Sequence, residues 1–251
     1  MTSPHVPLGT DRGSDPAEFA PEPSSPESGP SFAAAEVAAR LAEVRGRIAG
    51  AGGDPGAVTV VAVTKGFGPE AVVAATGAGL WDIGENYAQE LLAKASQAPD
   101  GVRWHFLGPV QRNKVAGLAP HVALWQGLDR PAAGEAIARR SPGARVLLQV
   151  NVSGEATKAG CPPEDAPGLL DELRRLPLEV AGLMAVGAAG KPEEARAGFR
   201  ALALLARRTG LRELSMGMSG DLEVAVEEGA TMVRIGRSLF GPRPGTPRLR
   251  R

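Results

Sequence analysis

Short apolar runs alternate with helix-compatible stretches along most of this chain, and no other sequence feature restricts its fold as strongly. Eight runs are predicted as strands, at residues 58–64, 80–83, 103–107, 122–126, 145–150, 180–186, 213–216 and 232–235. Helical patterns lie between them, among them residues 69–78, 86–96, 163–176, 192–208 and 222–228. Several of these begin with proline, which is favoured in the first turn of a helix. This alternation is typical of parallel strands joined by crossover helices.

Eight strand–helix repeats predict an α/β fold, a single closed (β/α)8 barrel of the TIM type. The competing architecture is an open, doubly wound sheet. A dinucleotide-binding sheet of that kind carries a GxGxxG turn after its first strand, whereas residues 63–66 here read VTKG. We therefore expect the barrel, with a leading helix over residues 31–48 whose apolar residues share one face.

The two ends of the chain differ in composition from the rest. Residues 1–30 hold seven of the 22 prolines among serine, glutamate and glycine, a composition that buries too little apolar surface to offset the entropy lost on ordering. They lack the basic start and the apolar segment of a signal peptide. We expect a disordered tail at residues 1–30, one domain at residues 31–241, and a solvated Arg/Pro-rich tail at residues 242–251.

The charge and cysteine content exclude several classes of partner. The 28 basic and 28 acidic residues balance, so the chain has no net field to concentrate nucleic acid or an anionic membrane around it. Cys161 is the only cysteine, which excludes an intrachain disulfide, and no Cys/His cluster suits a zinc ion. No apolar run is long enough to cross a membrane. We expect a cytoplasmic protein without metal, nucleic-acid or membrane partners.

Lysine is scarce in this chain, because the 28 basic residues are 23 arginines and five lysines. Under a composition this rich in arginine, a lysine tends to persist where a guanidinium cannot replace it, for example where an amine must form an imine. The lysines are Lys65, Lys94, Lys114, Lys158 and Lys191. We expect Lys94 and Lys191 to be ordinary surface residues, because lysine is seldom buried.

Lys65 follows the apolar run at residues 58–63, and in a barrel of this type the C-terminal ends of the strands form the active face. Burial at that rim disfavours the ammonium form, so the pKa falls and free amine becomes available to attack an aldehyde. A lysine that only extends from a loop into solvent fits the same position equally well.

An anion site is predicted where the seventh and eighth strands end. Residues 215–221 read SMGMSGD and lead into a helix, so backbone N–H groups and the Ser219 hydroxyl could converge on an anion. Taken alone, Ser219 is better explained as the cap of that helix, with Glu223 interacting with the helix dipole. Arg234 lies in an apolar strand and needs a partner, and Gly236 permits the close approach of a ligand. Together with the rim lysine, these features describe a site for a lysine-linked phosphorylated aldehyde.

Six motifs, in order along the chain, extend this pattern. They are AVTK at 62–65, GENYAQE at 84–90, WHFLGPVQRNK at 104–114, QVNVS at 149–153, GLMA at 182–185, and LSMGMS at 214–219 followed by VRIG at 233–236. From Ala35 to Gly241 the chain resembles the pyridoxal phosphate homeostasis proteins, a family related to the barrel domain of alanine racemase. That resemblance implies a barrel of the alanine racemase N-terminal type, with pyridoxal 5'-phosphate (PLP) as cofactor.

The resemblance also implies a set of cofactor-binding residues and no catalytic ones. The set is Lys65, Asn86, Met184, Ser215, Ser219, Arg234, Gly236 and Arg237. Lys65 would hold PLP as an aldimine, and Asn86 would lie near the ring hydroxyl. Ser219, with the backbone of Gly236 and Arg237, would bind the phosphate.

Arg234 would face the pyridine nitrogen of PLP. A charged guanidinium there disfavours protonation of that nitrogen, so the ring becomes a weak electron sink. Two departures from the family pattern lie at the lip of the pocket. Residues 66–69 read GFGP where a shorter polar turn is common, and Arg237 stands where a small residue is common. We expect the Arg237 side chain to point to solvent rather than to the phosphate.

The resemblance favours a carrier over an enzyme. A racemase of this fold class needs a second base, a tyrosine from a separate C-terminal domain of a partner subunit, and we expect no such domain in the ten residues after Gly241. The only tyrosine, Tyr87, is expected in the second loop. Neither His105 nor Cys161 is well placed for chemistry.

We therefore expect a monomeric, non-catalytic protein that holds PLP and takes part in its intracellular homeostasis, with PLP-dependent apo-enzymes as recipients. A weak PLP-dependent amino acid racemase and a cofactor-independent Schiff-base aldolase are the alternatives. Lys114 and Lys158, in loops after the third and fifth strands, are candidate secondary anion sites, although solvated loop charges explain them better.

Overall fold

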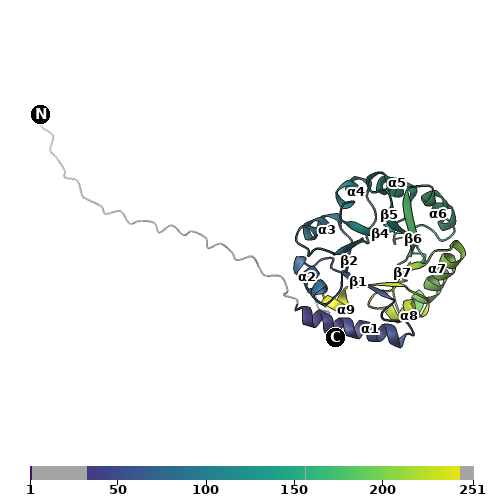
Figure 1. Ribbon diagram of the computed structural model, residues 1–251, viewed down its shortest axis with the longest axis horizontal. Helices are drawn as coiled ribbons and strands as arrows, with labels where there is room; N and C mark the ends of the chain where they lie inside the picture. The colour runs from purple at the N-terminus through teal and green to yellow at the C-terminus, as the bar shows by residue number, and fades with distance from the viewer. Residues whose placement is uncertain (2–32, 156, 244–251) are drawn as a thin grey trace.

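The computed structural model describes residues 1, 33–155 and 157–243. Its eight strands form a closed barrel in which each strand pairs in parallel with the next, and β8 pairs with β1. The strands are β1 Thr59–Val63, β2 Asp82–Glu85, β3 Arg103–Phe106, β4 Val122–Leu128, β5 Ala144–Gln149, β6 Leu178–Met184, β7 Glu213–Ser215 and β8 Met232–Ile235. Figure 1 shows the ring of strands with the helices around it. The predicted α/β barrel is confirmed.

Helices connect the strands on the outside of the barrel. They are α1 Ala34–Gly50, α2 Pro69–Gly77, α3 Ala88–Ala95, α4 Arg112–Leu118, α5 Pro131–Arg140, α6 Ala166–Arg174, the 3-10 helix η1 Pro192–Ala195, α7 Arg196–Thr209, α8 Leu222–Glu227 and α9 Arg237–Phe240. Helix α9 was not predicted, because four residues are too few to show a helical period.

The second strand begins two residues later than predicted. Leu80 was predicted as its first residue, but the N–H of Leu80 bonds to the carbonyl of Ala75 at 2.9 Å, and Gly79 has a φ of +84°. This backbone reversal terminates many helices. The apolar Leu80 therefore belongs to the end of α2, and the strand starts at Asp82.

Apolar side chains form two separate cores. The smaller one fills the barrel interior and comprises Val61, Leu124, Leu147, Met184 and Met232. The larger one lies between the strands and the surrounding helices and includes Ala62 and Ile83. Because side chains alternate along a strand, neighbouring residues of β1 face different cores. The same alternation places polar groups of successive residues on opposite sides of the barrel wall.

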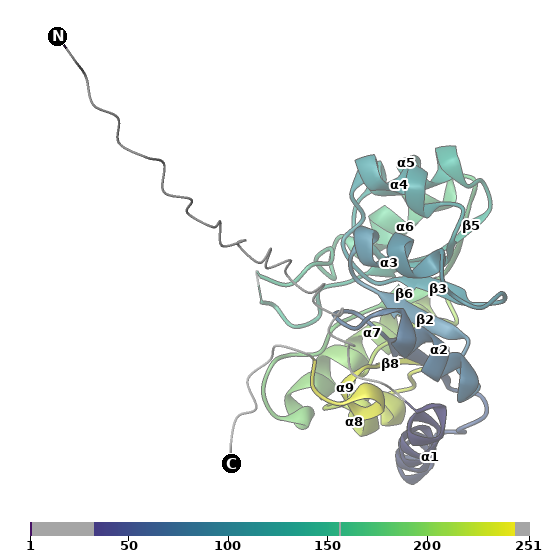
Figure 2. The same ribbon diagram turned by 90° about the vertical axis from the view of Figure 1, so that its left-hand side faces the viewer.

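Helix α1 closes one side of the barrel, where it contacts α2, α8 and α9 (Figure 1, Figure 2). Its apolar face is buried as predicted, through Val37, Leu41, Val44 and Ile48. Burial of a side chain of this size contributes about 1.5–3 kcal/mol. Helix α1 therefore anchors the segments that precede and follow β8.

Two arginines of α1 fasten it to those segments. Arg40 donates to the carbonyl of Leu239 at 2.9 Å, and Arg47 donates to the carbonyl of Ser219 at 3.0 Å. Arg47 also pairs with the carboxylate of Glu223 at 2.6 Å. Glu223, predicted as a partner of the helix dipole, is thus an ion-pair partner of α1.

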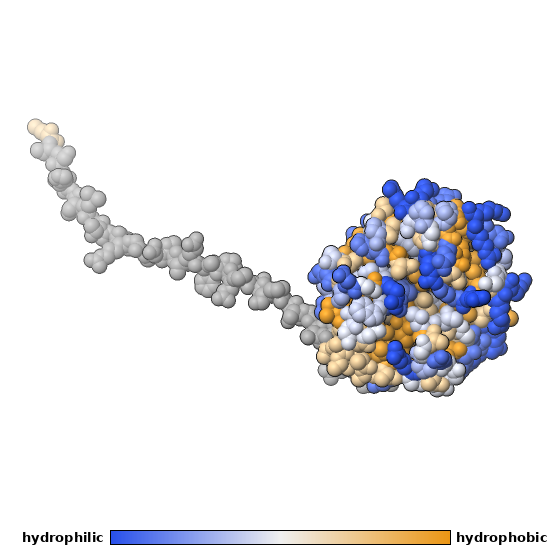
Figure 3. All heavy atoms as spheres, viewed as in Figure 1, coloured by the Kyte–Doolittle hydropathy of each residue, from blue (hydrophilic) through white to orange (hydrophobic). Residues whose placement is uncertain are grey.

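Hydrophilic and hydrophobic residues are interspersed on the face of the molecule shown in Figure 3. No helix in the described part of the chain is long and apolar enough to span a membrane. The predicted tail at residues 1–30 lies outside the described residues except for Met1, and of the predicted tail at residues 242–251 only residues 242 and 243 are described.

Candidate functional site

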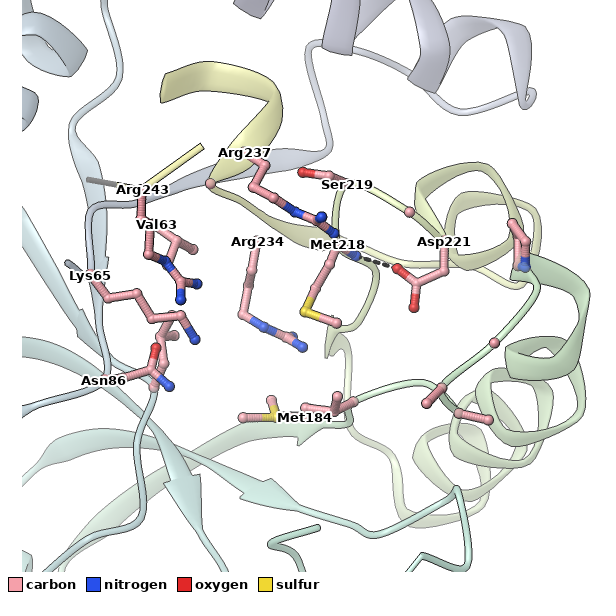
Figure 4. Close-up of a pocket in the computed structure, with 18 of the residues that line it drawn as sticks. Val63, Lys65, Asn86, Met184, Met218, Ser219, Asp221, Arg234, Arg237 and Arg243 are labelled. Carbon is pink, nitrogen blue, oxygen red and sulfur yellow. Dashed lines mark hydrogen bonds between the residues drawn. The ribbon is translucent and has the colours of Figure 1, made fainter. Parts of the chain in front are cut away.

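A cavity of about 470 Å³ opens at the C-terminal ends of the barrel strands (Figure 4). Its wall comes from the ends of β1, β6 and β8 and from the loops after β2, β3, β6 and β7. Seven of the eight predicted binding residues line it: Lys65, Asn86, Met184, Ser219, Arg234, Gly236 and Arg237. The eighth, Ser215, lies outside the wall.

Lys65 lies at the rim, in the turn that follows β1, and its amine extends into the cavity (Figure 4). Burial lowers the pKa of this amine, and the positive charges of Arg243 and Arg234 lower it further. Glu85 and Glu90 oppose the shift without reversing it. A lowered pKa leaves more of the amine unprotonated near neutral pH, and that form can attack an aldehyde.

Arg234, in β8, is a buried cation that no carboxylate of the described residues pairs with. Its guanidinium donates to the carbonyl and hydroxyl of Ser215 at 2.7 and 2.8 Å, and to the carbonyl of Ala185 at 2.8 Å. Burial lowers its pKa to about 10, and the charge of Asp221 opposes that shift. Arg234 is therefore still charged at neutral pH. A buried charge without a counter-charge is costly, so this guanidinium is suited to an electron-rich or anionic ligand.

Ser215 lies beneath Arg234 and is fully buried. Its hydroxyl donates to Oε1 of Gln126 at 2.6 Å, and Nε2 of Gln126 lies 2.7 Å from Nδ1 of His105. Because the amide nitrogen donates, Nδ1 accepts, and Nε2 of His105 carries the proton that faces Oδ1 of Asp82 at 3.0 Å. A chain of hydrogen bonds through the barrel interior thus orients Arg234, and His105 serves the structure rather than the cavity.

The loop between β7 and α8 places Ser219 at the cavity. The N-cap of α8 is Asp221, so the interpretation of Ser219 as the helix cap is wrong. Oδ1 of Asp221 accepts the N–H of Met218 at 2.6 Å, which fixes the turn just before Ser219. The hydroxyl oxygen of Ser219 accepts the N–H of Ser238 at 3.3 Å and so joins this loop to the start of α9.

Two further arginines border the cavity besides Arg234. Arg237, predicted to point to solvent, is exposed and also lines the cavity. Arg243 lies beside Lys65 (Figure 4). Its side chain packs on Gly66, where a Cβ would come within 3.0 Å of Cδ of Arg243. Sequence reasoning missed Arg243 because it assigned the residue to the C-terminal tail, and only the return of the chain from α9 brings it to the rim.

Lys94 is buried, with 3% of its surface exposed, so the prediction of a surface lysine is wrong. Its amine donates to the carbonyl of Thr64 at 2.8 Å and to Oε1 of Glu85 at 2.5 Å, and lies 3.2 Å from Oε2 of Glu90. One signal could have located it. Leu91, three residues earlier in α3, is apolar and buried, so the helical period puts Lys94 on the same inward face.

The other candidate lysines differ in their surroundings. Lys191 is exposed, as predicted, and lines the cavity. Lys158 donates to the carboxylate of Glu155 at 2.6 Å and to the carbonyl of Gly187 at 2.6 Å, so it ties two loops together. Lys114 lines a second cavity of about 430 Å³ that shares one wall residue with the first.

Neither remaining candidate base or nucleophile lies in the wall of the main cavity. Tyr87 is 62% exposed and lines the second cavity. Burial raises the pKa of the Cys161 thiol to about 11, so it is protonated and weakly nucleophilic at neutral pH. Within the described ranges, no group of three or more His, Cys, Asp or Glu residues could hold a metal ion.

Relatives by sequence cover most of the chain. Residues 35–244 match the family described as alanine racemase, N-terminal domain. The pyridoxal phosphate homeostasis protein of Pseudomonas aeruginosa is 45% identical over 218 residues, with 83% of this chain and 94% of that protein covered. The protein of the same name from Deinococcus radiodurans is 44% identical over 211 residues, with 81% and 99% covered.

Solved structures are similar in fold. PipY of Synechococcus elongatus, determined with PLP bound, has a TM-score of 0.71 at 33% identity and is covered completely, against 82% of this chain. Alanine racemase from Bacillus anthracis has a TM-score of 0.66 at 15% identity, with 86% of this chain and 58% of that chain covered. At that identity, the likeness to the racemase concerns the fold alone.

Proposed function

Because this chain belongs to the family of pyridoxal phosphate homeostasis proteins, we propose that it binds PLP through Lys65 and acts in the homeostasis of that cofactor. In this proposal residues 31–241 form the binding domain. The protein works in the cytoplasm as a monomer and hands PLP to apo-enzymes that need it.

The observation that carries this proposal is the pair of nitrogen groups that face each other in the cavity (Figure 4). One is the Lys65 amine, whose pKa is lowered by burial, and the other is the buried Arg234 guanidinium, which pairs with no carboxylate of the described residues. PLP has an aldehyde that a free amine attacks and a pyridine nitrogen that accepts a hydrogen bond. The two protein groups match these two groups of the cofactor.

Other parts of the wall suit the rest of the cofactor. Oδ1 of Asn86 is buried without a hydrogen-bond partner among the described residues, so it can accept a hydrogen from a bound molecule. Ser219 and the backbone of Gly236 and Arg237 would hold the phosphate, and the guanidinium of Arg237 would attract it as well. Met184 offers an apolar surface for the ring.

Ser215 contributes indirectly in this proposal. Its hydroxyl and carbonyl hold Arg234 from beneath, and it does not line the cavity. Among the predicted binding residues, it is the one that would not touch the cofactor.

The charge of Arg234 supports carriage rather than catalysis. Bound PLP supplies an electron sink whose strength depends on protonation of the pyridine nitrogen, and a guanidinium beside that nitrogen disfavours its protonation. Among the described residues of the cavity wall there is no tyrosine, histidine or cysteine to act as a second base. We therefore propose that the protein holds and releases PLP without sustained turnover of amino acids.

Spectroscopy and peptide mapping test the attachment. Protein loaded with PLP should show a visible absorption band that borohydride abolishes, and mass analysis should locate the reduced adduct on Lys65. Lys65→Ala should lose the adduct, whereas Lys191→Ala, which removes another lysine of the same cavity, should keep it. A colourless protein that cannot be loaded with PLP would contradict the proposal.

A transfer assay tests the role. Loaded protein mixed with a PLP-dependent apo-enzyme should restore that enzyme's activity while its own visible band declines. Chiral analysis of amino acids incubated with the loaded protein should detect no sustained racemisation, and sustained racemisation would support an enzyme instead.

A further inference from the structure

A cluster of charged side chains lies outside the barrel wall, directly behind the cavity. Glu85 ends β2, and its carboxylate accepts hydrogen bonds from Lys94 of α3 and from the hydroxyl of Thr64, the residue that follows β1. All three are buried, and the side chains of Lys94 and Glu85 are 4% and 0% exposed. Because side chains alternate along the chain, Thr64 points to this cluster while Lys65 points to the cavity. The cluster therefore adjoins the attachment lysine without lining its pocket.

The cluster holds the backbone on both sides of Lys65. Lys94 donates to the carbonyl of Thr64 at 2.8 Å, and Oε2 of Glu90 accepts the N–H of Gly66 at 2.8 Å. Lys94 and Glu90 are themselves paired at 3.2 Å, one turn apart on α3. The two neighbours of Lys65 in the chain are thus both bonded to side chains of one helix.

The geometry of Lys94 explains why this position keeps a lysine in a chain that otherwise favours arginine. An ammonium group has three N–H donors, and three acceptors surround it, from Thr64, Glu85 and Glu90. A planar guanidinium has a different donor arrangement and cannot reproduce this set. A lysine can therefore persist in this arginine-rich chain for two reasons: Lys65 because an amine can form an imine, and Lys94 because an ammonium group has three donors.

Stability alone does not account for such a cluster. Burying an ion pair costs desolvation free energy, and apolar side chains of similar volume stabilise a fold equally well or better. One carboxylate oxygen of the cluster, Oε2 of Glu85, is buried without a hydrogen-bond partner among the described residues, which adds to that cost. Because this costly arrangement holds both chain neighbours of Lys65, its role is to position that lysine.

We infer that Lys94, with Glu85 and Glu90, is a positioning residue for Lys65. It fixes the turn that carries Lys65, and so keeps the amine at the partly buried wall where the unprotonated form is favoured. This inference rests on the proposed function in one respect only, namely that Lys65 is the residue to which PLP attaches.

The expected direction of the effect follows from hydration, because burial is the largest cause of the lowered pKa of Lys65. In Lys94→Met the turn loses the bond from Lys94 to the carbonyl of Thr64, and the loosened turn exposes the Lys65 amine to water. Burial already raises the pKa of Glu85, so this carboxyl group takes up a proton when its partner is removed and adds no charge beside Lys65. The loss of burial should raise the pKa of Lys65 toward its ordinary value and leave less free amine at neutral pH.

The five lysines make the pKa of Lys65 measurable without cofactor. Reductive methylation of the apo-protein with isotope-labelled formaldehyde gives a small set of NMR signals whose shifts can be followed against pH, and Lys65→Arg identifies the signal of interest. The variants are Lys94→Met and Lys94→Arg. The control is Leu170→Ala in α6, a fully buried site on another side of the barrel that lowers stability without touching the cluster.

In Lys94→Met the pKa of Lys65 should rise by about one pH unit, and PLP should attach about tenfold more slowly at neutral pH. Leu170→Ala should leave both values unchanged at a comparable loss of thermal stability. Unchanged values in Lys94→Met would overturn the inference.

Lys94→Arg keeps the charge and is the second route if Lys94→Met does not fold. It should slow attachment as well, because the guanidinium cannot hold the turn; wild-type behaviour in this variant would show that charge alone matters, and would overturn positioning. Failure of the proposed function is distinguishable. In that case the wild-type protein forms no borohydride-stable adduct on Lys65, whatever the NMR titration of Lys94→Met gives.

Discussion

Two buried cations stand close to the cavity, and the fold balances them in opposite ways. Lys94 meets the carboxylates of Glu85 and Glu90. Arg234 is 5% exposed, and the described residues that bond to its guanidinium offer the neutral oxygens of Ser215 and Ala185. Both charges are costly to bury, but within the described ranges only Lys94 has a carboxylate partner. A buried cation with its own counter-charge holds a wall together, whereas one without is available to a ligand.

The largest effect is expected at the neutralised cation. Lys94→Met should lower the free energy of unfolding of the apo-protein by about 3–5 kcal/mol, because removing one partner leaves the buried Glu85 carboxylate uncompensated. Urea unfolding measures it. Lys191→Met, at an exposed lysine, is the control and should change the value by less than about 0.5 kcal/mol. Equal losses in the two variants would mean that the Lys94 cluster is not a structural ion pair.

At Arg234, substitution should affect PLP binding more than the stability of the apo-protein. Arg234→Met should weaken PLP binding by about 2–5 kcal/mol, since it removes a buried partner of the ligand. The apo-protein should lose much less stability than in Lys94→Met, because the removed charge had no counter-charge among the described residues. Equilibrium dialysis measures the loss of PLP binding, and urea unfolding measures the loss of apo-protein stability. A loss of apo-stability as large as that of Lys94→Met would show that Arg234 is balanced within the fold.

A smaller effect on binding is expected from the chain of hydrogen bonds beneath Arg234. Gln126→Leu removes the link between Ser215 and His105, and should weaken PLP binding by about 1–3 kcal/mol through a less well oriented guanidinium. The double variant that carries both Gln126→Leu and Arg234→Met should then bind PLP no more weakly than Arg234→Met alone. Additive losses in this double-mutant cycle would place Gln126 outside the chain that acts on Arg234.

The smallest effect concerns pH. The folded pKa of Lys65 lies below its ordinary value of 10.5, so between those two values the unfolded chain binds more protons than the folded one. The free energy of unfolding should therefore gain a contribution that rises with pH across that window. Lys65→Met should remove this rise while keeping the length of the side chain. Identical pH profiles of unfolding for wild type and variant would exclude a lowered pKa.

The barrel was predictable because apolar runs and helical periods depend on neighbouring residues only. Seven of the predicted binding residues lie in the wall of one cavity, since the strand order puts all strand ends on one face. Leu80 misled the prediction of β2, because apolar residues also terminate helices. In the same way, Asp221 rather than Ser219 occupies the N-cap position of α8, because the backbone geometry, which residue type alone does not determine, sets where the helix starts.

Three features could not be predicted from residue types. Lys94 was assigned to the surface because lysine is seldom buried, and its two carboxylate partners lie on different elements. Arg243 reaches the cavity only through the path of the chain after α9. The role of Ser215 depends on Gln126, which is 89 residues away in the sequence. The helical period of α3 indicates only that Lys94 faces inward, and the contacts of Arg243 and Ser215 depend on elements that are distant in the sequence.

Because β1 pairs with β8, the site can form only after the last strand of the barrel has been synthesised. Val61 in β1 lies opposite Arg234 in β8. A chain is synthesised from its N-terminus, so Lys65 leaves the ribosome long before Arg234 does. Until the ring of strands closes, Lys65 has neither the burial that lowers its pKa nor the guanidinium that faces it. A nascent chain therefore presents an ordinary lysine, and the proposed capture of an aldehyde by Lys65 would belong to the completed barrel alone.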